Sequence, residues 1–100
     1  MTATNELRLL PWRSPEDKPC YLSTDNPNGY MSRLADNVEA VQLGRAAALL
    51  EVVSKTLDDE RADQMALRRL GHALTAALEE VLRVAISRGH LLAASEPHRI

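Results

Sequence analysis

Two groups of carboxylates in this sequence have a spacing that could serve a metal ion. Asp36 and Glu39 are three residues apart, so they share one face of a predicted helix, and hard cations such as magnesium prefer carboxylate ligands. Such a site needs several carboxylate pairs on facing helices, and the second helical segment supplies no matching pair. A second acidic group reads as a helix end followed by an N-cap and an acidic first turn. The carboxylates of this second group could also bind a cation; its members are Asp58, Asp59, Glu60 and Asp63. We nevertheless predict no metal and no cofactor.

Cys20 and His72 are the other residues whose types could do chemistry. Cys20 lies between Pro19 and Tyr21 with no base beside it, and a nucleophilic thiol needs one unless folding brings His72 or His90 close. His72 has no ExxH or HExxH spacing around it, as a zinc ligand would. The sequence also contains no Gly-rich phosphate loop and no GxSxG motif. We predict no catalytic residue and no enzymatic activity.

Composition and charge argue against several classes of partner. The 100-residue chain has the size of one domain, and its 45% apolar fraction is that of a globular protein. A net charge of −2 favours no nucleic-acid partner, because phosphates demand a basic face. No apolar run approaches the roughly 18 residues of a membrane span, and no signal-peptide pattern is present. With a single cysteine and no internal disulfide, we expect a cytoplasmic protein without membrane contact.

The elements that position these residues begin with the stretch from Met65 to Ser87. At about 100° per residue its apolar side chains form one stripe within roughly 80°, which predicts an amphipathic helix over residues 61–89. Gly89 is a suitable residue to end it, and residues 95–100 are expected to be a flexible tail. Leu74 lies in the middle of this apolar stripe and is expected in the core. The stripe consists of Leu67, Leu70, Leu74, Leu78, Val81 and Ala85.

A first long helix is predicted over residues 32–57, with Ser32 as its N-cap. Its apolar arc spans about 220°, roughly twice what one partner helix covers. Gly44, with alanines nearby, is expected at a close helix crossing. Because a short connection makes the two helices antiparallel, the wide arc predicts a homodimer that forms a four-helix bundle.

Residues 1–31 are predicted to form an extended arm, because proline recurs every four residues at Pro11, Pro15 and Pro19. Residues 20–24 have strand character and precede a turn at 25–29, so a short β-hairpin with residues 30–31 or an irregular loop is expected. The arm holds all three aromatic residues and the only cysteine. We predict that it binds a protein partner or caps the helices, through Trp12, Cys20, Tyr21 and Tyr30.

Four short stretches also resemble a known group of proteins. LPW at Leu10–Trp12, KPCYLS at Lys18–Ser23, GYMSRLAD at Gly29–Asp36 and EAVQLG at Glu39–Gly44 are similar to small actinomycete proteins common in streptomycetes. The resemblance covers roughly residues 9 to 90 and implies no activity, cofactor or binding residue. Because such proteins are often encoded near transcriptional regulators, it favours a regulatory or partner-binding role.

The sequence therefore predicts an all-α fold, a long antiparallel helical hairpin with an extended Pro-rich arm. The predicted function is a non-enzymatic protein-interaction or regulatory module acting as a homodimer. The alternative is a regulator that binds a small ligand or nucleic acid, and an enzyme comes third.

Overall fold

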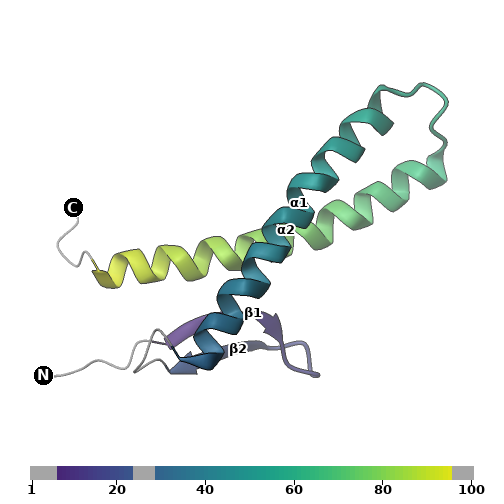
Figure 1. Cartoon of the computed structure of the whole chain (residues 1–100). Coiled ribbons are helices and arrows are strands. Elements are labelled where there is room, and N and C mark those ends of the chain that lie inside the picture. Colours follow the sequence, from purple (N-terminus) through teal and green to yellow (C-terminus); the bar gives the residue numbers. More distant parts are fainter. Residues whose placement is uncertain (1–6, 24–28, 96–100) are drawn as a thin grey trace, which may run out of the picture.

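The computed structural model describes residues 7–23 and 29–95. In order, they form strand β1 (Leu7–Arg13), strand β2 (Pro19–Ser23), helix α1 (Tyr30–Asp58) and helix α2 (Gln64–Ser95). The start of the arm (1–6), the last residue of the expected strand with most of the expected turn (24–28), and most of the expected tail (96–100) lie outside the described residues. Figure 1 shows two long helices that make a hairpin, with a small sheet beside one end of it. The predicted helical hairpin is confirmed.

The ends of the helices differ from those expected. Helix α1 begins after Gly29, which has extended backbone and no side-chain cap, so the prediction of Ser32 as N-cap is wrong. Ser32 is instead buried in the first turn of the helix. The expected end at Gly89 is wrong: α2 continues to Ser95, and no described glycine has the positive φ of a helix C-terminal cap.

The N-terminus of α2 follows local chemistry that is visible in the sequence. The carboxylate of Asp63 accepts a hydrogen bond of 2.8 Å from the backbone N–H of Ala66, which is the geometry of an N-cap. In the connection before it, Asp59 accepts from the backbone N–H of Arg61 and pairs with its guanidinium. The acidic connection therefore ends one helix and begins the next, as the sequence predicted for a helix end followed by an N-cap.

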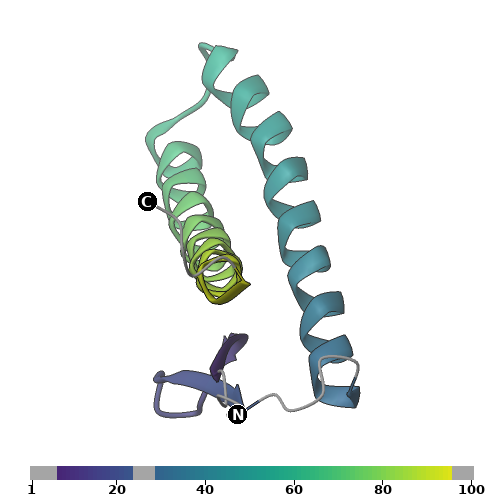
Figure 2. The ribbon, with the colours of Figure 1, turned by 90° about the vertical axis from the view of Figure 1, so that its left-hand side faces the viewer.

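The two helices run antiparallel but obliquely to each other. They cross in Figure 1, and in the perpendicular view of Figure 2 α2 points toward the viewer while α1 stands upright. The C-terminal half of α2 passes above the sheet (Figure 2). The angle between the helices leaves room at this end for β1, which packs against both of them.

The sheet is antiparallel, but its strands are not the pair that the sequence predicted. Strand β2 pairs with β1, with Leu7 opposite Ser23 and Leu9 opposite Tyr21, whereas residues 30 and 31 already belong to α1. The reversal lies at Ser14, whose hydroxyl accepts hydrogen bonds from two backbone N–H groups that follow it. Asp17 completes this turn with a φ of 63°. Two local signals, a Ser turn and an aliphatic strand at residues 7–10, outweighed the Asn-Pro-Asn-Gly signal downstream.

The core is small and unusually polar. The buried apolar side chains of the described residues are Leu10, Pro11, Ala35, Val53 and Val84. Five buried residues carry polar side chains and gather mainly where β1 meets the helices: Arg8, Ser32, Glu39, Gln42 and Ser87.

Two predictions about packing are wrong for the single chain. Leu74, expected in the core, has 37% of its surface exposed, because α2 turns Val84 and Ser87 inward instead. A Cβ added to Gly44 would meet nothing within 4 Å, so this glycine does not mark a close crossing. Both differences follow from the oblique crossing of the helices and from β1, which packs on part of the surface that the second helix was expected to cover. Within the described residues, neither helix is long and apolar enough to cross a membrane.

Candidate functional site

The first feature is an ionic cluster of two buried and two exposed side chains that joins β1 to both helices. Arg8 on β1 donates to Asp36 of α1 at 2.7 Å and to the carbonyl oxygen of Ser32 at 3.1 Å. A further Nη2 to Oε2 distance of 3.3 Å links Arg8 to Glu39, whose other oxygen lies 3.4 Å from Arg88 on α2. We call these four charged residues the Arg8 cluster: Arg8, Asp36, Glu39 and Arg88.

The Arg8 cluster accounts for the carboxylate pair that resembled a metal site. Asp36 and Glu39 do share one helix face, but two guanidinium groups lie against them and supply the positive charge that a cation would bring. Within residues 7–23 and 29–95, no three Asp, Glu, His or Cys side chains gather closely enough to hold a metal ion. The chemistry of this cluster is therefore that of an ion-paired contact between elements.

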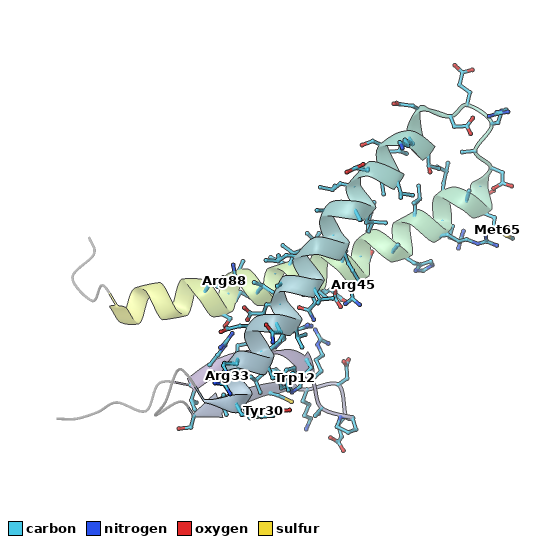
Figure 3. All side chains as sticks on the ribbon, in the orientation of Figure 1. Trp12, Tyr30, Arg33, Arg45, Met65 and Arg88 are labelled. Carbon is cyan, nitrogen blue, oxygen red and sulfur yellow. The ribbon has the colours of Figure 1, made fainter. Side chains whose placement is uncertain are left out.

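A second feature is a depression of about 370 Å³, which we call the Trp12 depression. Three elements meet there: the end of β1 with its turn, one residue of α1, and the middle of α2. Figure 3 shows Trp12 on the sheet, below the crossing of the helices. Behind it, the amide of Gln42 donates to the carbonyl oxygen of Pro11 at 2.8 Å. The lining residues are Pro11, Trp12, Arg13, Asp17, Gln42, Ala76, Glu79, Glu80 and Arg83.

The charges around the Trp12 depression are only partly paired. Arg13 lies 3.0 Å from Asp17 across the turn, and Glu80 lies 3.2 Å from Arg45 of α1. Glu79 and Arg83, four residues apart on α2, form no ion pair with each other among the described residues. One carboxylate and one guanidinium thus line the depression with their charges unmatched.

The four residues proposed to bind a partner do not meet in one place. Trp12 is half-buried and lines the depression, which none of the other three residues does. Cys20 and Tyr21 are neighbours on a strand and so point to opposite faces of the sheet. Tyr21 and Tyr30 are both exposed, Tyr21 on the sheet and Tyr30 in the first turn of α1.

The third feature is a set of exposed leucines on one side of the hairpin. Positions on each helix can be compared by their rotation about the helix axis, at about 100° per residue. Leu50 is rotated roughly 60° from the centre of the buried face of α1. Leu74 is rotated roughly 90° from the centre of the buried face of α2, and in the same direction along the sequence. In two antiparallel helices, residues rotated in the same direction from the contact face lie on the same side of the hairpin. Arg45 and Glu80, which lie in the opposite sense, form an ion pair and mark the other side.

We call this surface the leucine side. Between residues 40 and 57 of α1 and between 67 and 85 of α2, no charged residue interrupts it. Leu50 and Leu78 have 62% and 60% of their surfaces exposed, and Leu57 and Leu67 are exposed as well. Its members are Leu43, Leu50, Leu57, Leu67, Leu70, Leu74, Leu78 and Val81.

Sequence reasoning missed Arg8 and Gln42. A charged residue between leucines in a strand gives only an alternation signal, and a glutamine in a helix gives no sign in the sequence that it is buried. His72, which the sequence singled out, is exposed on α2 in a shallow hollow with no second ligand-type side chain.

No protein-family model, curated protein or solved structure matches this chain.

Proposed function

We propose that this protein is a non-enzymatic interaction or regulatory module that acts as a homodimer. A second copy covers the leucine side, and the two hairpins together make a four-helix assembly. The observation that carries this proposal is the uncharged leucine side itself. Monomeric proteins rarely expose a continuous apolar surface of this length.

The shape of the single chain supports a missing partner. Its radius of gyration is 17.4 Å, against about 13 Å for a compact domain of this length. Its accessible surface is 7605 Å², whereas a compact monomer of the same mass has about 5,700 Å².

The composition of the core points the same way. Few apolar side chains are buried in the single chain, and a domain of this length needs more apolar burial to offset its conformational entropy. The leucine side supplies eight further apolar residues. Burying them against a second copy would give the assembly the aliphatic core that the composition predicts.

The dimensions of the leucine side suit a second copy. Its helix segments are each about 27 Å long and about 10 Å wide, so two of them side by side present roughly 540 Å². Two copies would remove about 1,100 Å² of such area, which reaches the threshold of a specific interface. The absence of charges means that the same surface can face itself across a two-fold axis without repulsion.

This arrangement leaves the sheet end of each hairpin free for a partner protein. Tyr21 and Tyr30 are exposed there, and rigid aromatic side chains are common at interaction hot spots. With Trp12 and Cys20 they remain the proposed partner-binding residues. In affinity capture, a partner should be retained by the full chain, lost with Tyr21→Ala, and kept with Met65→Ala, an equally exposed residue at the far end of α2.

Light scattering on the purified full chain tests the dimer. The expected mass is twice 11.1 kDa at tens of micromolar. Leu50→Glu should shift the chain to a monomer, because it places charges face to face in the dimer core. Val52→Glu is the matched control: Val52 has 53% of its surface exposed on the same helix, but on the other side of the hairpin.

A monomeric wild-type chain would refute the dimer. Equal loss of dimer in Leu50→Glu and Val52→Glu would place the interface elsewhere. A dimer that survives Leu50→Glu and Leu78→Glu together would do the same, since both substitutions put charge in the centre of the leucine side.

A further inference from the structure

We propose that the Trp12 depression binds a free α-amino acid with an apolar side chain. This ligand would make the homodimer a ligand-responsive module, which goes beyond the proposed interaction function.

The depression lies where three separate elements converge. The turn of the sheet forms one wall, α2 forms the other, and Gln42 of α1 lies between them. Its volume of about 370 Å³ is within the range of small-molecule sites. Pro11, Trp12 and Ala76 give it an apolar surface suited to a short aliphatic or aromatic group.

The unmatched charges of Glu79 and Arg83 define the polar part of the ligand. At i,i+4 on one helix their Cβ atoms are about 6 Å apart, and a carboxylate placed before a cation at this spacing normally pairs with it. Here both side chains line the depression without forming that pair. Their charged neighbours in the lining are already paired, with Asp17 against Arg13 and Glu80 against Arg45.

A ligand with one charge would pair with only one of these two side chains. A zwitterion uses both: its ammonium pairs with Glu79, and its carboxylate accepts hydrogen bonds from the Arg83 guanidinium. An internal segment of a protein has no adjacent ammonium and carboxylate, so a free α-amino acid fits better. Its side chain would then lie against Trp12.

Gln42 adds an independent sign of a missing polar partner. The residue is nine-tenths buried and lines the depression, and its Oε1 has no hydrogen-bond partner among the described residues. A buried acceptor left in this state is costly. This oxygen is not accessible from the depression, so the Gln42 side chain would have to move before the ammonium of a ligand could donate to it.

The site and the leucine side can be tested separately, because they lie on opposite sides of the hairpin. Arg45 and Glu80, which mark the side away from the leucines, form the ion pair beside the depression. Binding of an amino acid can therefore fail while the dimer persists, and the reverse also holds.

Trp12 is the only tryptophan, so its fluorescence reports directly on the site. We would titrate the full chain with L-leucine and with L-phenylalanine, and repeat each titration by calorimetry. N-acetyl-L-leucine lacks the ammonium and L-leucinamide lacks the carboxylate. The expected result is saturable binding of at least one free amino acid. Removing the ammonium or the carboxylate from leucine should weaken binding about tenfold or more. Removing the charge of the protein side chain that pairs with either group should have the same effect.

The variants are Glu79→Gln and Arg83→Gln, with Glu51→Gln and Arg33→Gln as controls at exposed positions outside the depression. If either variant melts at a lower temperature, its loss of binding could come from unfolding, and Ala76→Leu then tests the site instead. It fills the depression from an exposed helix position, keeps all charges, and should abolish binding.

Absence of saturable binding for both amino acids by both methods would overturn the proposal. Equal binding of leucine and its two derivatives would overturn it as well, because the charges would then play no part. Unchanged binding in Ala76→Leu would place the ligand outside the Trp12 depression.

Discussion

Arg8 and Glu39 are an oppositely charged pair buried at the junction of β1 and α1. Arg8 Nη2 lies 3.3 Å from Glu39 Oε2, and only 2% of the Glu39 side chain is exposed. The Nε of Arg8 and this same Oε2 make no hydrogen bond within the described residues. The sheet is thus held against the helices by charges that water reaches poorly, so removing one partner should cost much more than it would at a surface.

Glu39→Ala should lower the free energy of unfolding by about 3–5 kcal/mol, because it leaves the buried guanidinium of Arg8 without its buried counter-ion. Asp36→Ala is the control: this carboxylate also binds Arg8 but is mostly exposed, so its loss should cost about 1 kcal/mol or less. Urea unfolding at one fixed protein concentration measures both. Similar losses for the two variants would mean that water screens Glu39 as well.

Leu74→Ala separates a single-chain core from a core formed between copies. In the dimer this side chain would be buried, and its truncation should cost about 2–5 kcal/mol, with a stability that falls on dilution. In a lone chain, where Leu74 is over one-third exposed, the loss should be small. Thermal unfolding across a hundredfold range of protein concentration distinguishes the two. A small loss that does not vary with concentration would argue against the leucine side as an interface.

Asp63→Ala should destabilise the start of α2 by about 1 kcal/mol, because it removes the acceptor for the backbone N–H of Ala66. Asp58→Ala removes a nearby carboxylate at the other end of the connection and should change stability by no more than about 0.5 kcal/mol. Chemical unfolding compares them. If both substitutions had equal effects, net charge rather than capping would explain the result.

Gly44→Ala should stabilise the protein by about 1 kcal/mol. The added Cβ meets no atom within 4 Å, and alanine favours the helix over glycine by about that amount. The melting temperature should therefore rise. A decrease would show that Gly44 is covered by a second copy or a partner, since the single chain leaves it open.

Local sequence patterns determined most of the secondary structure. The spacing of apolar residues in each helix repeats every turn, so the amphipathic period alone located α1 and α2 to within a few residues at most ends. Asp63 was among the carboxylates expected to cap and begin the second helix, and it does so. The prolines correctly excluded a helix before residue 19. The turn chemistry was less decisive, because two turn signals competed and the one at Ser14 was overlooked.

The tertiary structure decided which face of each helix is buried and which charges meet. Arg8 and Glu39 are 31 positions apart, and a charge in a helix normally indicates a solvated face, so no local pattern could have predicted their burial. The same holds for Val84, which the oblique crossing of α2 turns inward in place of Leu74. Helix periodicity is a property of neighbouring residues, whereas the direction in which a helix faces depends on what packs against it. Here that is β1, whose register with β2 and contact with both helices arise only when the chain folds back on itself.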